Sequence, residues 1–138
     1  MSFTESFRQT LLDHLTATQY YDPEGLYLAL FEDVELTTEL TSPAPDLTDP
    51  QNPVFPTGYY RQVVPLPDFD PGEDRTYTTS AVEFQIVQDV TVAAVALCGS
   101  DVVGTADVIT SKAFATPLVL TNGQTVRFEP ATVSLQLI

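Results

Sequence analysis

The residues of this chain that could do covalent chemistry are few and far apart. His14, the one histidine, stands beside Asp13, and Cys98 is the one cysteine. A histidine next to a carboxylate can activate a thiol that lies within reach. Cys98, however, ends the apolar run Val92–Leu97, where a thiol usually packs as a small hydrophobic group. Because no nucleophile-elbow or Cys/His signature surrounds these residues, we expect a protein that is not an enzyme and has no catalytic residues.

The acidic stretch 68–74 is the best candidate for an ion site. Asp68, Asp70 and Asp74 have spacings similar to those in the first half of an EF-hand calcium loop. The similarity ends at the twelfth position, where Thr79 stands in place of the bidentate glutamate. Zinc would need three or four histidine or cysteine ligands. We therefore expect no metal and no cofactor, and interpret 68–74 as an acidic surface turn, with calcium as the weaker alternative.

Aromatic and acidic residues give only weak signals for carbohydrate chemistry. Five tyrosines could line a sugar platform, but tyrosines in β-proteins are more often core or interface residues. They are Tyr20, Tyr21, Tyr27, Tyr59 and Tyr60. With nineteen acidic residues, some carboxylate pair will lie close by chance, so a glycosidase pair is not a specific signal. A module that binds carbohydrate on a cell surface is therefore one functional hypothesis, and it ranks below the structural hypotheses given at the end of this section.

The charge of the chain argues against two classes of partner. Nineteen acidic residues against five basic ones give a formal net charge of −14, and Lys112 is the only lysine. Such a surface repels DNA and anionic lipid. No segment approaches the roughly 18 apolar residues of a membrane span, and residues 1–6 do not resemble a secretory signal. We expect no nucleic acid and no membrane partner, and synthesis in a cytoplasm.

An N-terminal helix is predicted over residues 2–18. Phe3, Phe7 and Leu11 recur every four residues, which is typical of one helix face. Ser2 followed by Glu5 predicts a capping box at the start of the helix. Such a stripe usually packs on its own domain, and docking on another subunit is the alternative.

Most of the remaining chain predicts short strands. The expected strands are Leu26–Phe31, Tyr59–Leu66, Thr76–Val87, Val90–Leu97, Val102–Ile109 and Thr132–Ile138, with Lys112–Thr116 as a link. Asn122-Gly123 predicts a two-residue type I′ hairpin between Leu118–Leu120 and Thr125–Phe128. This pattern predicts one mainly β domain over residues 1–138, an antiparallel β-sandwich or jelly-roll-like barrel with one N-terminal amphipathic helix.

Residues 37–58 interrupt the series of strands. They are rich in threonine, proline and aspartate, and prolines at this density remove hydrogen-bond donors and favour extended polyproline II backbone. A loop longer than about 15 residues is usually functional or disordered. The segment either packs over its own domain or lies along a neighbour as an arm, and the sequence leaves both open.

The order of three motifs resembles a family of small β-sandwich virion proteins of tailed bacteriophages. The motifs are Leu26–Phe31, then Gly58–Val64 around Arg61, then Gly123–Phe128. The proline-rich segment 37–58 and the long N-terminal helix depart from the family pattern. The resemblance implies a structural protein of the virion and provides no catalytic residues.

The resemblance leads to a specific functional hypothesis. The chain would be a capsid decoration (cement) protein, a homo-oligomer on the outer surface of the major capsid protein lattice, assembled in the host cytoplasm. The alternative is a tail, baseplate or fibre-adaptor protein that contacts another virion protein. The expected partner-binding residues lie on the helix stripe and the proline-rich segment: Phe3, Phe7, Leu11, Pro43, Pro45, Pro50, Pro53 and Phe55.

Overall fold

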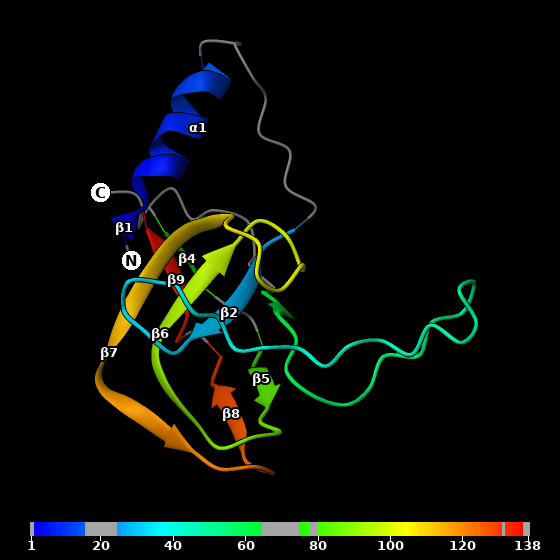
Figure 1. The fold of residues 1–138 in the computed structure, drawn as a ribbon. Coiled ribbons are helices and arrows are strands. Elements are labelled where there is room, and N and C mark those ends of the chain that lie inside the picture. The colour runs from blue at the N-terminus through cyan, green and yellow to red at the C-terminus, as the bar shows by residue number, and fades with distance from the viewer. Residues whose placement is uncertain (1, 16–24, 65–74, 78–79, 131, 137–138) are drawn as a thin grey trace.

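The chain is mainly β, with antiparallel sheets and one short helix near the N-terminus (Figure 1). The computed structural model describes residues 2–15, 25–64, 75–77, 80–130 and 132–136. The elements are β1 (Ser2–Phe3), α1 (Glu5–Leu15), β2 (Tyr27–Phe31), β3 (Gln62–Val63), β4 (Arg75–Tyr77), β5 (Val82–Gln85), β6 (Val90–Cys98), β7 (Val108–Leu120), β8 (Thr125–Phe128) and β9 (Ser134–Gln136). The mainly β class and the N-terminal helix are thereby confirmed.

A five-stranded sheet in the order β1-β7-β6-β2-β3 forms the centre of the molecule. β6 is a central strand, as its continuous apolar run predicted, and it pairs with β2 so that Leu28 stands opposite Leu97. Large side chains of β2 and β6, including Leu30 and Val92, point to one face of this sheet. The other face carries alanines and Cys98 packed around Phe31. Because both faces are covered, β6 needs no polar positions along its buried length.

Two short strand pairs complete the described part of the fold. β5 pairs with β8, and β4 pairs with β9. In β5 Val82 and Phe84 are buried while Glu83 and Gln85 are exposed, as the alternation predicted. Phe84 stacks on Tyr59 with ring centroids 5.8 Å apart and meets Phe128 edge-on. The main core therefore lies between the large-residue face of the five-stranded sheet and the β5–β8 pair.

The N-terminal helix starts later than predicted. Ser2 and Phe3 pair with Ser111 and Thr110 as the edge strand β1, so the backbone there is extended and the predicted capping box at Ser2 is wrong. Thr4 caps α1 instead: its Oγ1 accepts the Phe7 N–H at 3.3 Å and donates to the carbonyl of Val108 at 2.8 Å. The cap therefore also ties α1 to β7.

The predicted hairpin at Asn122-Gly123 is also wrong. β7 pairs with β6 and β8 pairs with β5, so this turn joins two different sheets. The Gln124 N–H donates to the Thr121 carbonyl at 3.1 Å, and Gly123 has a φ of +94°. Asn122 does not share the positive φ that a type I′ turn requires at both central positions. The pairing of β8 with β5, in which Val126 stands opposite Phe84, takes the place of the local hairpin.

The strand β7 also differs from the prediction. Residues 99–107 form a loop, and the single long strand Val108–Leu120 replaces the expected strand Val102–Ile109 and the expected link Lys112–Thr116. The pairing of β6 with β7 jumps between Ala94↔Ala113 and Val92↔Leu118. Residues 114–117 therefore bulge opposite Ala93, and the bulge bends β7.

Burial of Cys98 makes a testable prediction about pH. Burial raises the pKa of the Cys98 thiol to about 12, and the nearby Arg61 only partly opposes this. An exposed cysteine in the unfolded chain ionises near pH 8.5. The folded state thus loses stability as pH rises from about 8.5 towards 12, because only the unfolded thiol ionises. We expect iodoacetamide to label Cys98 at pH 8 only after urea unfolding, measured by mass spectrometry. Rapid labelling of the native protein would contradict the buried placement.

Candidate functional site

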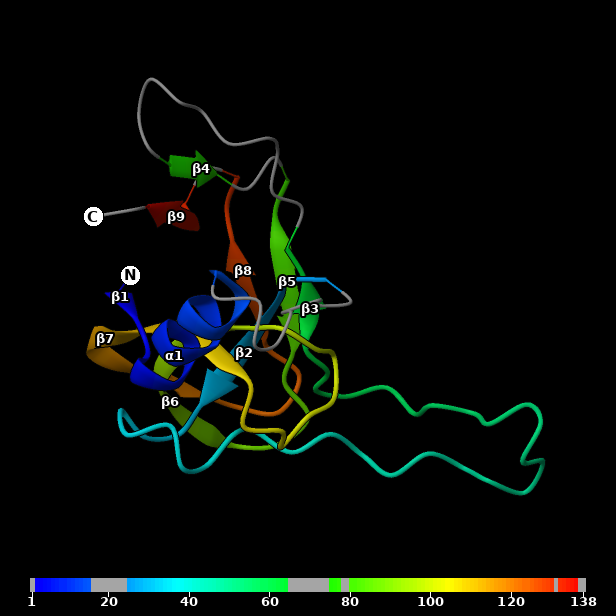
Figure 2. The same ribbon diagram turned by 90° about the horizontal axis from the view of Figure 1, so that it is seen from above.

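The most prominent feature of the surface is a long projecting arm, which we define as residues 41–57. It leaves the sheet beyond β2, extends away from the body and returns towards β3 (Figures 1 and 2). All side chains from Ala44 to Phe55 are exposed, so the segment does not pack over its own domain. The apolar side chains of Leu47, Val54 and Phe55 are each more than 60% exposed. Exposed apolar side chains grouped on one projection are typical of a binding surface.

The outer part of the arm has a defined backbone structure. Asp46 and Val54 form an antiparallel bridge, with N···O distances of 2.7 and 3.0 Å for its two hydrogen bonds. At the turn beyond the bridge, the Asp49 carboxylate accepts the Gln51 N–H, and the Asp49 carbonyl accepts the Asn52 N–H. The Asp46 carboxylate likewise accepts the Thr48 N–H. The arm therefore ends in an ordered hairpin-like tip.

The root of the arm continues the edge of the main sheet. After β2 the chain turns tightly and pairs back on the strand, with a bridge between Phe31 and Glu39 and a 3.0 Å hydrogen bond from Leu40 N–H to the Leu30 carbonyl. The Asp33 carboxylate accepts the N–H groups of Thr37 and Thr38, which holds this turn closed. The side-chain hydrogen bond from Thr37, the largest contribution, lowers the pKa of Asp33.

One buried arginine joins the root of the arm to the rest of the protein. The side chain of Arg61, which follows the returning leg, has no solvent exposure. Its Nη2 donates to Glu39 at 2.7 Å and to the Thr105 carbonyl at 2.8 Å, and its Nε donates to Glu39 at 3.0 Å. Its Nη1 donates to Asp107 at 2.7 Å and to the Ser100 carbonyl at 3.0 Å. All five guanidinium N–H groups thus have acceptors, as a buried cation requires.

The carboxylate of Glu39 is the second centre of this network. It also accepts the hydroxyl of Tyr59 at 2.9 Å and the backbone N–H of Gly104 at 3.0 Å. The Tyr59 oxygen in turn accepts the Leu30 N–H at 3.0 Å. Burial, and then the charge of Glu39, raise the pKa of Tyr59 far above its ordinary value. Burial alone would lower the pKa of Arg61, but its bonds to Glu39 and Asp107 outweigh this and raise it, so the guanidinium stays charged.

The two legs of the arm touch at Gly58 and Pro43. A Cβ on Gly58 would lie 2.7 Å from Cγ of Pro43, closer than non-bonded carbon atoms approach. Only glycine allows the legs to pack this closely. Above this contact Phe55 meets Tyr60 edge-on, and the Tyr60 hydroxyl donates to the Pro56 carbonyl at 3.0 Å.

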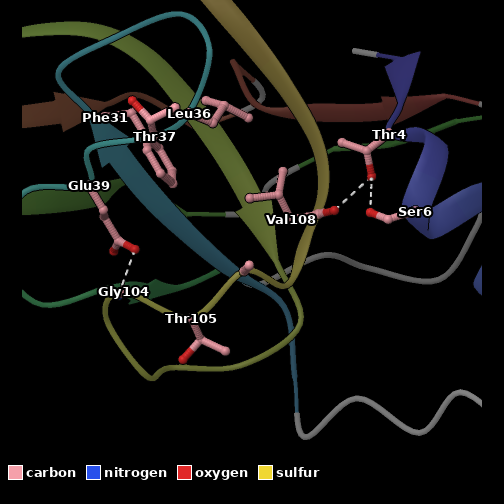
Figure 3. A pocket seen from close by; sticks show the side chains of 10 residues that line it. Thr4, Ser6, Phe31, Leu36, Thr37, Glu39, Gly104, Thr105 and Val108 are labelled. Atoms are coloured by element: carbon pink, nitrogen blue, oxygen red, sulfur yellow. Dashed lines mark hydrogen bonds between the residues drawn. The ribbon is translucent and has the colours of Figure 1, made fainter.

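A cavity of about 310 Å³ lies beside the network, between the loop 99–107 and the start of α1 (Figure 3). Two polar groups of its lining are hydrogen-bonded: the Glu39 carboxylate accepts the Gly104 N–H, and the Thr4 hydroxyl donates to the Val108 carbonyl (Figure 3). Within the described residues, no group of three His, Cys, Asp or Glu side chains could hold a metal ion. The Arg61 network holds the root of the arm and the loop 99–107 together.

The residues predicted to bind partners fall into two separate regions. Pro43, Pro45, Pro50, Pro53 and Phe55 all lie on the arm. The helix-stripe residues Phe3, Phe7 and Leu11 are half-buried at the opposite side of the main sheet, where the Phe3 and Phe7 rings are 5.2 Å apart (Figure 1). The structure does not bring these two groups together, and their roles in binding stay predictions.

Several other residues considered from the sequence have other roles or cannot be placed. Tyr59 is buried in the core, so it cannot belong to an exposed sugar platform. Asp68, Asp70 and Asp74 lie outside the described residues, as do Tyr20 and Tyr21. The His14 side chain is likewise not described.

Sequence reasoning missed the network of Arg61, Glu39 and Asp107. The one available signal was a charged residue inside the β-prone run Gly58–Val64. A strand position that is charged and buried needs a partner of opposite charge. Its partners, however, are 22 and 46 residues away, and no local pattern points to them.

Comparison with known protein families finds no match to this chain, and comparison with curated proteins finds none either. Among the helical residues that the structure describes, none belongs to a helix long and apolar enough to cross a membrane. The function must therefore be argued from the geometry and from the sequence.

Replacing Arg61 tests whether the network fixes the fold. We expect Arg61→Met to lower the free energy of unfolding by about 3–5 kcal/mol, because the buried carboxylate of Glu39 would lose its cationic partner. The matched control is Arg127→Met, whose exposed ion pairs with Glu83 and Glu129 contribute little. Urea denaturation followed by circular dichroism measures both. Equal stability of the two variants would show that the buried network is not structural.

Gly58 and Pro43 allow a double-mutant test of the contact between the legs. Gly58→Ala should cost about 1–3 kcal/mol, because the new methyl group collides with the Pro43 ring. In the background of Pro43→Ala the same substitution should cost clearly less, since the colliding atoms are gone. Thermal melting of the wild type, the two single variants and the double variant gives the coupling free energy between positions 43 and 58. Strictly additive effects would mean that the two legs do not touch.

Proposed function

We propose that this chain is a non-enzymatic structural protein of a tailed-bacteriophage virion, bound to the outer capsid lattice as a decoration protein through its projecting arm. The observation that carries the proposal is the arm itself, an ordered projection with apolar side chains and a rigidly held root. Proteins that act alone in solution rarely expose several large apolar side chains on one projecting segment.

The physical properties of the arm suit docking on a neighbour. The prolines at 43, 45, 50, 53 and 56 fix φ, and the Asp46–Val54 bridge orders the tip. A segment that is already extended loses little conformational entropy when it binds. The buried Arg61 network transmits any force on the arm to the core of the domain, because it ties the chain after the returning leg to Glu39 and to the loop 99–107. Both properties are useful in a protein that clamps a shell.

Charge and architecture also support the proposal. A formal net charge of −14 favours a basic partner surface and disfavours packaged DNA, which suits the outside of a capsid. The packing of the β5–β8 pair against one face of the main sheet fits the β-sandwich expected from the motif order. On this proposal the partner is the major capsid protein, and no cofactor takes part.

An arm-replacement variant tests the role in the virion. We expect a chain with residues 44–55 replaced by a short Gly-Ser linker to melt as the wild type does, because this segment contributes no core residue. The variant should be absent from purified virions, measured by immunoblot. Virions without the protein should release DNA at a lower temperature, measured by dye fluorescence during heating.

Each outcome of that experiment has a separate meaning. Full occupancy of the arm-replacement variant would overturn the role of the arm. Unchanged heat resistance of virions that lack the protein would overturn the decoration role. Immunogold labelling of intact virions provides the position, and label on the tail would make the protein a tail, baseplate or fibre-adaptor component instead.

A further inference from the structure

A second cavity lies on one face of the main sheet, where its lining reaches from Leu28 of β2 to Ala115 of β7. Where β7 bulges, it opens a groove of about 390 Å³ between the sheet and the segment that follows β8. The groove is mainly apolar, and Lys112 stands in its lining. Its other lining residues include Val95, Ala113, Phe114, Ala115, Phe128 and Val133. We refer to this feature as the β7 groove.

The outer edge of β7 beside this groove is open. β1 pairs only with Thr110 and Ser111, and no described residue pairs with the outer edge of β7 beyond them. An open strand edge can accept an extended segment from another chain through main-chain hydrogen bonds. Val119, further along β7, is 78% exposed. The groove and the edge together therefore form a surface suited to an extended, partly apolar segment.

We propose that the tip of the arm of one copy occupies the β7 groove of a second copy. The chain thus provides both the inserted segment and its receptor. This inference deepens the proposed function, since it names how the copies would join to one another.

The shape of the arm tip fits a groove better than a flat surface. Val54 points to the same face as its bridge partner Asp46. Leu47 follows Asp46, and successive side chains of an extended backbone point to opposite faces. The two apolar side chains, 61% and 63% exposed, therefore lie on opposite faces of the tip. A receptor that covers both must have two walls, which are provided by the sheet on one side and by Phe128, Thr132 and Val133 on the other.

Charge also favours docking of the arm tip in the β7 groove. In a chain with a formal net charge of −14, most surfaces of two copies repel each other. The β7 groove contains the only lysine, while Arg61 and Arg127 are held by carboxylates of their own chain. The arm tip carries Asp46 and Asp49 next to its apolar residues. Docking of the tip thus brings acidic groups to one of the few basic positions available.

The direction of the arm indicates that the groove it enters belongs to another copy (Figures 1 and 2). The arm links β2 to β3 at one edge of the sheet, and β7 lies towards the other edge. Both views show the arm extending away from β7 (Figures 1 and 2). A contact between opposite edges is heterologous, so successive copies join head to tail and form a ring or a filament.

Two complementary variants test this arrangement in the full-length chain. The arm variant is Leu47→Ser with Val54→Ser, and the groove variant is Ala115→Glu, which places a charge in the apolar groove and repels the acidic tip. Each should weaken self-association by about tenfold or more, measured by analytical ultracentrifugation over a concentration series. Val34→Ser and Gln85→Glu are the matched controls, because both positions are exposed away from the arm tip and the groove.

Mixing the two variants gives the decisive result. The groove variant retains a working arm, and the arm variant retains a working groove, so an equimolar mixture should form dimers and nothing larger. Wild-type protein that stays monomeric at all concentrations, or a mixture that forms no dimers, would overturn the inference. A monomeric protein that still binds capsids through its arm would overturn only this inference and leave the proposed function standing.

Discussion

The rest of the structure depends on a guanidinium that is fully removed from solvent. Arg61 comes out of water only because two carboxylates and two backbone carbonyls accept all five of its N–H groups. Its acceptors come from the turn after β2 and from the loop 99–107, two segments that no strand pairing joins. Taking a charge out of water costs several kcal/mol, so these segments must adopt the geometry that satisfies it. The network therefore specifies the local structure, whatever its net contribution to stability.

The arm can project because its root is held in this way. Glu39 stands just before the start of the outgoing leg, and Arg61 follows the returning leg. Their ion pair closes the root, and the contact of Gly58 with Pro43 brings the legs together just above it. Above that point Tyr60 contacts Phe55 and Pro56, and the outer part of the arm is held by its own bridge and turns. An isolated two-stranded hairpin is only marginally stable in water. Contacts with a partner would therefore stabilise the hairpin-like tip.

Much of the sheet could be predicted because burial leaves a local pattern. A strand covered on both faces is continuously apolar, as in β6, and a strand covered on one face alternates, as in β5. The start of α1 could not be predicted this way. Ser2 pairs with the distant Ser111, and this pairing holds the backbone extended where the local pattern favours a helix. The hairpin prediction at Asn122-Gly123 failed for the same reason: a local turn preference does not decide which distant strand lies alongside.

The sequence by itself determined that residues 37–58 interrupt the series of strands, because prolines at this density remove hydrogen-bond donors that a ladder needs. It also determined the apolar strands, whose hydrophobic periodicity is a local property. Only the tertiary structure decided that the segment projects as an arm, that Arg61 is buried at its root, and that a groove opens at the far edge of β7. These features depend on contacts between residues far apart in the chain, and such contacts exist only once the whole sheet has formed.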